Sequence, residues 1–272
     1  MRVLITGSGS RLGAALLQAL SPHYDVLTLD LTGHGHGPGP TYVGDPRDRE
    51  VAARAVAGCD AIVHLPPLAP AEASPVDVLD AATRGTYNLI TTAASATRFI
   101  LISSLRLFER YPMEWRVTEQ WAPRPTTDVE DLAPYLAECT VREVARVAPL
   151  KAIALRLGEV VDDDDVRDRS PDARWLHVED AVHAVERALA YDVPAPVHHE
   201  PTFDPPATGW WVFHVPGAAR RLASRWRWRA SRPSATFPRT ISARASPCPS
   251  PRTPTARPSD SPTRRVAPRA TW

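Results

Sequence analysis

Short apolar runs alternate with longer amphipathic segments along the chain up to residue 191, and this alternation constrains the fold more than any other feature of the sequence. Each apolar run has the length and composition of a strand that is buried on both faces. Each longer segment places apolar residues at the spacing of one helix face. Strands and helices that alternate in this way form a parallel sheet covered on both sides. The sequence therefore predicts an α/β fold with a doubly wound parallel sheet.

We expect strands at residues 2–6, 25–30, 61–65, 98–103 and 151–157, and helices at residues 11–21, 46–57, 76–95, 131–147 and 178–191. The helix at 131–147 is expected to open at Pro134, because proline is favoured in the first turn of a helix. Tyr135 then lies one position inside it.

The first turn of the predicted fold has the composition of a phosphate-binding loop. In "VLITGSGSRLGAAL" this loop follows a strand and opens a helix. Glycines there permit a tight turn and a close approach of a pyrophosphate, and the helix N-terminus supplies free N–H groups and a partial positive charge. A turn with a purely structural role is the alternative. The sequence favours a Rossmann dinucleotide site formed by Gly7, Ser8, Gly9, Ser10, Arg11, Leu12 and Gly13.

Asp30 ends the second expected strand, 17 residues after Gly13. An acidic residue in this place accepts hydrogen bonds from the adenosine ribose hydroxyls and repels a 2′-phosphate. No arginine lies between Asp30 and Arg47 to bind such a phosphate. The predicted cofactor is therefore NAD. A solvated aspartate at a strand end is the alternative interpretation.

Several motifs follow the glycine loop in a fixed order: "VGDPRD" (43–48), "CDAIVHLPP" (59–67), "RGTYNLITTAA" (84–94), "RFILISSLRLF" (98–108), "LRLGEVV" (155–161) and "WLHVEDAVHAVERAL" (175–189). With them, residues 1–217 resemble the extended short-chain dehydrogenase/reductase superfamily, in particular the NAD-dependent epimerase/dehydratase family. The glycine loop departs from the family's TGxxGxxG because its middle glycine lies at position 9 instead of 10. The resemblance implies cofactor contacts from Asp45, which faces the adenine, and from Leu65 and Pro66 after the fourth strand.

The resemblance also implies a set of reacting groups. In this family a tyrosine acts as general acid/base, a serine or threonine orients the substrate oxygen, and a lysine four residues after the tyrosine binds the nicotinamide ribose. Tyr135 matches the tyrosine and Ser104 matches the serine, with Ser103 as the second choice. Cys139 stands at the position of the lysine. A thiol brings no positive charge to lower the tyrosine pKa, so proton transfer is expected to be slow.

Three functions are compatible with this set of residues. The first is an NAD-dependent oxidoreductase or epimerase that acts on a secondary alcohol of a sugar or nucleotide-sugar. The second, which rests on Cys139, is an NAD-binding sensor or partner protein with impaired catalysis. Arg142 is a poor geometric substitute for the lysine. The third and least favoured is nucleic-acid association through a basic C-terminal tail.

That tail, residues 218–272, contains 13 arginines, nine prolines and one acidic residue, without helical or strand periodicity. Such a composition cannot bury enough apolar surface to fold, so we expect disorder. Lys151 is the only lysine of the chain, which is typical of a GC-rich coding sequence. An out-of-frame reading of such DNA yields this Arg/Pro/Ser mixture, and a shifted or foreign C-terminus is the leading explanation. Residues 1–217 then form the NAD-binding domain, with a reduced substrate region at about 158–217.

The remaining features exclude several classes of protein. The three cysteines have no paired spacing, so neither disulfides nor a metal site is expected, and a reducing cytoplasm fits. No apolar run is long enough to span a membrane, and "MRVLITG" lacks the features of a secretion signal. The acidic run 162–165 is expected to be a solvated loop, and His177 a helix cap. By resemblance, the helices at 76–95 and 131–147 form a homodimer interface.

Overall fold

The computed structural model describes residues 1–33, 39–67, 69–70, 72–93, 97–112, 115, 117–167, 169–170, 172–192 and 209–217. The chain separates into two units, Met1–Trp226 and Arg227–Trp272, and the described residues all belong to the first. The basic tail at 218–272 lies outside the described residues, and so do His34 and His36 of the glycine-rich segment 32–40.

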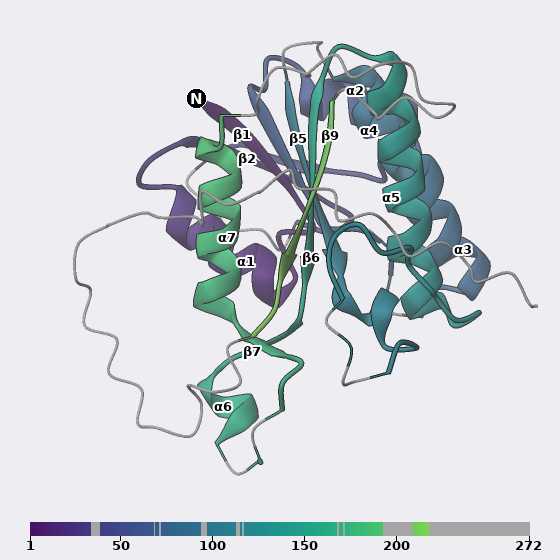
Figure 1. Cartoon of the computed structure of the whole chain (residues 1–272). Helices are drawn as coiled ribbons and strands as arrows, with labels where there is room; N and C mark the ends of the chain where they lie inside the picture. Colours follow the sequence, from purple (N-terminus) through teal and green to yellow (C-terminus); the bar gives the residue numbers. More distant parts are fainter. Residues whose placement is uncertain are drawn as a thin grey trace, which may run out of the picture. The chain divides into compact units, whose positions relative to one another are not determined.

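A parallel sheet forms the centre of the fold and confirms the predicted fold class (Figure 1). Its seven strands run in the order β3-β2-β1-β4-β5-β6-β9, and every neighbouring pair is parallel. Their bounds are β1 Arg2–Thr6, β2 Asp25–Asp30, β3 Thr41–Val43, β4 Ala61–His64, β5 Arg98–Ser104, β6 Lys151–Leu157 and β9 Trp210–Val215. The order reverses next to β1, and in such sheets ligands bind at the carboxyl ends of the strands there.

Helices cover both faces of this sheet (Figure 1). One face carries α1 (Arg11–Leu20) and α7 (Val178–Ala190), and the other carries α2 (Arg49–Val56), α4 (Thr86–Thr92) and α5 (Val129–Val147). The single helix expected at 76–95 is α3 (Pro75–Asp80), one π-helical turn η1 (Ala81–Gly85) and then α4. Smaller elements follow the carboxyl ends of β5 and β6: η2 (Leu105–Phe108), α6 (Asp163–Val166), and the two-stranded parallel sheet of β7 (Glu159–Val161) and β8 (Trp175–His177).

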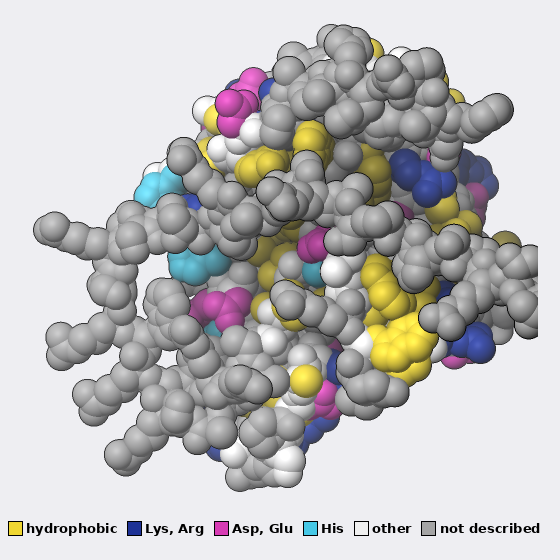
Figure 2. All heavy atoms as spheres, in the orientation of Figure 1, with side chains coloured by type: hydrophobic (Ala, Val, Ile, Leu, Met, Phe, Trp, Pro, Cys, Tyr) yellow, Lys and Arg dark blue, Asp and Glu magenta, His cyan; other side chains and the backbone are white. Residues whose placement is uncertain are grey.

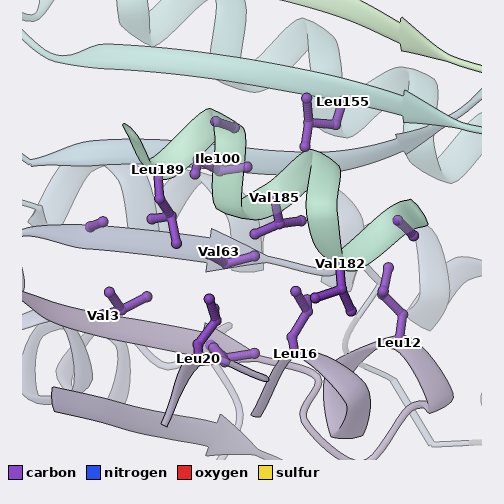
Figure 3. Close-up of a cluster of buried hydrophobic side chains, with 14 of the residues drawn as sticks. Val3, Leu12, Leu16, Leu20, Val63, Ile100, Leu155, Val182, Val185 and Leu189 are labelled. Atoms are coloured by element: carbon purple, nitrogen blue, oxygen red, sulfur yellow. The ribbon is translucent and has the colours of Figure 1, made fainter. Parts of the chain in front are cut away.

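Two apolar cores hold the layers together, one on each face of the sheet. In the first, Leu16 and Leu20 of α1 and Val185 of α7 pack against Val3 and Val63 of the central strands (Figure 3). All five side chains are fully buried. Burial of each such side chain contributes about 1.5–3 kcal/mol, so the periodicity that predicts these elements also accounts for their packing.

The structure corrects two sequence-based expectations. Helix α5 begins at Val129, so Pro134 lies inside the helix. Asp128 precedes the helix, and Glu130 and Asp131 place negative charge in its first turn, which stabilises an earlier start. The acidic run 162–165 is also not a loop. Asp162 accepts hydrogen bonds from the backbone N–H groups of residues 164 and 165 and caps the short helix α6.

Other expectations agree with the structure or were incomplete. His177 caps α7 as expected, with its side chain accepting a hydrogen bond from the backbone N–H of Glu179 at 3.3 Å. On β9, Trp211 packs against the first core and Trp210 against the second. The strands β3, β7 and β8 were not predicted, because runs of three residues carry too little periodicity to be detected.

His64, at the carboxyl end of β4, is a fully buried titratable group. Its Nδ1 lies 2.7 Å from the hydroxyl of Thr6, and its Nε2 lies 2.9 Å from the hydroxyl of Thr86. Burial lowers the pKa of His64 to about 3. The imidazole is therefore neutral in the folded protein and joins β4, β1 and α4 by hydrogen bonds.

When the pH falls from 7 to 5, we expect the titration of His64 to lower the free energy of unfolding by about 2 kcal/mol. Because its pKa falls from 6.5 to about 3 on folding, the unfolded chain takes up the proton first, and stability is lost as the pH falls below 6.5. The variant His64→Gln keeps hydrogen-bonding groups without titrating, so it should lack this loss. Urea unfolding of both proteins at the two pH values measures it. An equal pH dependence would contradict the prediction.

Candidate functional site

The turn between β1 and α1 is shaped by two glycines. Gly7 has a φ of 74°, which side-chain-bearing residues rarely adopt. A Cβ on Gly13 would lie 2.2 Å from the carbonyl oxygen of Gly7, so only glycine allows the first turn of α1 to pack this closely on the strand end. Ser10 caps the helix: its hydroxyl accepts a hydrogen bond from the Gly13 N–H at 3.1 Å and donates one to the Gly7 carbonyl at 2.8 Å. Ser10 stands where the family has its middle glycine, and its role in this structure is to cap α1.

Asp30 is bound to this turn. Its Oδ2 accepts a hydrogen bond from the Gly9 N–H at 2.7 Å and lies 3.4 Å from the hydroxyl of Ser8, and its Oδ1 accepts one from the Leu31 N–H at 2.8 Å. A carboxylate offers about four acceptor positions, so acceptor capacity remains for ribose hydroxyls. The glycine cradle, the helix N-terminus and this carboxylate together fit the adenosine half of NAD.

Replacing Asp30 with alanine is expected to weaken NAD binding by about tenfold to a hundredfold, because hydrogen bonds to a charged group contribute about 1.5–3 kcal/mol. Removal of the carboxylate should also reduce the preference for NAD over NADP. Calorimetric titration with both dinucleotides measures these effects. Asp25→Ala is the matched control, because Asp25 begins the same strand and pairs with Arg2 at the surface. Unchanged NAD affinity in the Asp30 variant would contradict the assignment.

Arg11 and Leu12 open α1, but the two side chains have different environments. Leu12 is buried in the core between α1 and α7. The guanidinium of Arg11 pairs with Asp165, and its Nε lies 3.5 Å from Asp162. Two carboxylates of α6 and its N-cap thus engage the positive charge at the start of α1.

The other predicted cofactor residues lie at the carboxyl ends of neighbouring strands. Asp45 follows β3, and its carboxylate accepts hydrogen bonds from the Arg47 backbone at 2.9 Å and side chain at 2.8 Å. The pKa of Arg47 is raised, chiefly by this hydrogen bond. Leu65 and Pro66 follow β4, and the Leu65 N–H lies 3.3 Å from the hydroxyl of Thr6 at the end of β1. The topology therefore brings these residues to the edge where the glycine loop lies.

The two candidate serines at the end of β5 face different surroundings. The hydroxyl of Ser103 is buried and lies 2.5 Å from Oε1 of Glu138 on α5. Ser104 is partly exposed, and its hydroxyl accepts a hydrogen bond from the Arg106 N–H at 3.1 Å. Because the Ser103 hydroxyl is held in the core by Glu138, Ser104 is the serine that fits an encounter with a substrate.

Glu138 belongs to a buried polar network that sequence reasoning missed. Its two carboxylate oxygens accept hydrogen bonds from Nε and Nη2 of Arg156 on β6, at 2.9 and 2.7 Å. Nη1 of Arg156 lies 3.3 Å from Nε2 of His214 on β9, and its guanidinium lies over the ring of Phe108 at 4.9 Å. Burial lowers the pKa of His214. The signals were an arginine within the apolar run "KAIALRL" and a glutamate on the buried face of α5.

Tyr135 and Cys139 lie one helical turn apart on α5. Tyr135 packs against the cluster of Leu107, Phe108 and Tyr111, which also contacts Leu105 next to Ser104. The pKa of Tyr135 is raised above its ordinary value of 10, first by the charge that a Cys139 thiolate carries, then by the hydrogen bond with Cys139 and by partial burial. Arg142 opposes this shift, but its Nε donates a hydrogen bond to Glu143 at 3.0 Å. The site therefore disfavours tyrosinate.

Comparison with known proteins identifies the family. The NAD dependent epimerase/dehydratase family matches residues 3–164. The chain belongs to this family. The resemblance read from the motifs is thereby confirmed, and so is NAD as the cofactor that the family uses. A search of curated proteins finds no match.

Solved structures share the fold of this family member at low sequence identity. A short-chain dehydrogenase/reductase superfamily protein from Agrobacterium tumefaciens with bound NAD is 22% identical, with a TM-score of 0.63 over 79% of this chain and 77% of that one. Glucuronic acid dehydrogenase from Chromohalobacter salexigens is 23% identical, with a TM-score of 0.62 over 80% and 77%. UDP-glucose 4-epimerase from Thermotoga maritima, with UDP-glucose, is 19% identical, with a TM-score of 0.59 over 79% and 77%.

The described residues contain no helix that is both long and apolar enough to cross a membrane. They also contain no group of three or more histidine, cysteine or acidic side chains placed to hold a metal ion.

Proposed function

We propose that this family member is an NAD-dependent oxidoreductase or epimerase that acts on a secondary alcohol of a sugar or nucleotide-sugar. The observation that carries the proposal is that Tyr135 and Leu105, the residue after Ser104, pack against one small cluster, Leu107, Phe108 and Tyr111, which follows the carboxyl end of β5. The sugar and nucleotide-sugar enzymes among the structural neighbours support the substrate class.

Each residue has a distinct part in this proposal. The glycine loop and Asp30 hold the adenosine and pyrophosphate of NAD, which accepts a hydride when bound. Ser104 donates a hydrogen bond to the substrate oxygen. Tyr135 takes the hydroxyl proton during oxidation and returns it during reduction. Ser103 supports this arrangement through its hydrogen bond to Glu138, without touching the substrate.

Cys139 supports a second candidate function, an NAD-binding sensor or partner protein with little turnover. The raised pKa of Tyr135 keeps the phenol protonated at neutral pH. A general base works best when its pKa lies near the operating pH, so the proton transfer is slow with this pair of residues. The two functions differ in whether bound NAD is turned over.

The test uses the full chain with NAD and a panel of aldoses, uronic acids and UDP-sugars. Formation of NADH, or interconversion of UDP-sugar epimers detected by chromatography, supports the enzyme. The variant Tyr135→Phe is the control, because it removes the hydroxyl while retaining the ring, and it should lose the activity. NAD binding without turnover of any panel member would favour the sensor function and contradict the enzyme function. Absence of NAD binding would contradict both functions.

The expected homodimer stays a prediction. A groove of about 740 Å³ is lined by residues of α4 and α5, among them Ile90 and Val144, and by the turn that follows α5. Tyr87 and Val147, which line the same groove, are 50% and 86% exposed. Light scattering of the purified protein determines the oligomeric state. A strictly monomeric protein would refute the prediction.

A further inference from the structure

An aromatic cluster in the loop between η2 and α5 is not used by the proposed mechanism. The ring of Trp121 lies 4.9 Å from that of Tyr111 and 5.6 Å from that of Trp115, in edge-to-face arrangements. Tyr111 is buried, and its hydroxyl donates a hydrogen bond to the Ala122 carbonyl at 2.8 Å. Trp115 packs at the end of the cluster and remains 50% exposed. Packing thus explains Tyr111 but leaves half of the Trp115 surface in water.

The cluster shares its apolar base with the residue predicted to react. Trp121 and Tyr135 both pack against Leu107, Phe108 and Tyr111. The aromatic surface therefore extends from the neighbourhood of the Tyr135 phenol toward solvent. On the α5 side of the sheet, hydrophobic side chains gather at the molecular surface (Figure 2). A molecule that reacts at Tyr135 and is longer than its reacting group would meet this surface.

A cation lies on the same cluster. The guanidinium of Arg124 is centred 4.1 Å from the ring of Tyr111, and Arg124 is exposed. No carboxylate among the described residues pairs with it, whereas Arg106 pairs with Glu130 at 2.9 Å and Asp131 at 3.0 Å. An arginine held over an aromatic ring keeps its donors free at the edge, where they suit a carboxylate or a phosphate.

We propose that Trp115, Trp121 and Arg124 form a subsite for the charged part of the substrate, and that the substrate is an anionic sugar. Its ring packs with C–H groups against the electron-rich face of Trp115, and its carboxylate or phosphate pairs with Arg124. This inference rests on the proposed function, because it places the subsite beside the group that would react. It adds a negative charge to the chemical description of the sugar and names the residues that would bind it.

The test is calorimetric titration of the NAD-saturated protein with glucuronate, glucose 1-phosphate and neutral glucose. We expect both anionic sugars to bind at least about tenfold more tightly than glucose, and the stronger of the two identifies the anion. Arg124→Gln should abolish this preference. Trp115→Ala should weaken the binding of all three sugars by about tenfold, because one well-placed aromatic contact contributes about this much to affinity.

Arg2→Gln is the matched control, because Arg2 is an exposed arginine that pairs with Asp25 at 2.8 Å at the amino end of β1. It should bind all sugars as the unmodified protein does, and all variants should keep NAD affinity, which shows that they are folded. Equal affinity for glucose and the anionic sugars, no sugar binding at all, or unaltered binding by both subsite variants would overturn the inference. Anionic-sugar binding without NADH formation would leave it standing while the proposed function fails. NADH formation from neutral sugars alone would support the proposed function and overturn the anionic-sugar subsite.

Discussion

The variant Cys139→Lys is expected to raise turnover by about 10²- to 10⁴-fold, the range that a well-tuned general base contributes. A lysine ammonium one helical turn from Tyr135 favours the phenolate and lowers the pKa of Tyr135, whereas the pair with Cys139 raises it. The rate of the unmodified protein should therefore keep rising into the alkaline range, and that of the variant should level off at lower pH. Steady-state rates across a pH series measure both effects.

A second readout does not depend on knowledge of the substrate. Ionisation of a phenol changes its ultraviolet absorbance, and subtraction of the Tyr135→Phe spectrum isolates Tyr135 from the other tyrosines. The midpoint of this titration should fall in Cys139→Lys. Cys139→Ala is the control, since it removes the thiol without adding a cation and should gain much less. No change in rate or midpoint in the lysine variant would show that Cys139 is not the cause of the raised Tyr135 pKa.

The variant Glu138→Gln is expected to reduce the free energy of unfolding by about 3–5 kcal/mol, because it leaves the buried Arg156 guanidinium without its counter-charge. Both side chains of the pair are only 5–6% exposed, so water cannot replace the lost partner. Urea unfolding at constant pH measures the change. It should accompany a loss of cofactor-dependent activity, since α5 carries Tyr135 as well as Glu138.

Arg84→Gln is a matched control for this effect. Arg84 binds Asp80 with the same two-bond geometry, at 2.9 and 2.6 Å, but at the surface. Exposed pairs contribute about 0–1 kcal/mol, so this variant should be nearly neutral. Replacement of both Glu138 and Arg156 by methionine should recover much of the loss. A Glu138 variant as stable as the Arg84 variant would refute a structural role for the buried pair.

The strands that could be predicted from sequence are those in which a continuous run of apolar residues indicates burial. β1, β2 and β6 have the predicted bounds because each is an apolar run buried on both faces. The edge strand β9 was not predicted: it follows residues 193–208, which lie outside the described part of the chain, and all six of its residues are only partly buried. Its pairing with β6 depends on a contact between segments far apart in sequence.

The chemistry of the candidate site divides in the same way. The sequence by itself determined the glycine loop, the place of Asp30 at the end of β2 and the one-turn spacing of Tyr135 and Cys139, because a glycine that tolerates no Cβ and residues at fixed helical spacing act through local geometry. Only the tertiary structure decided that Ser103 belongs to a buried Glu138–Arg156 network and that Arg124 lies over an aromatic cluster. These contacts join side chains from separate helices, strands and loops, so they form only when the layers pack. Local periodicity in the sequence therefore cannot predict them.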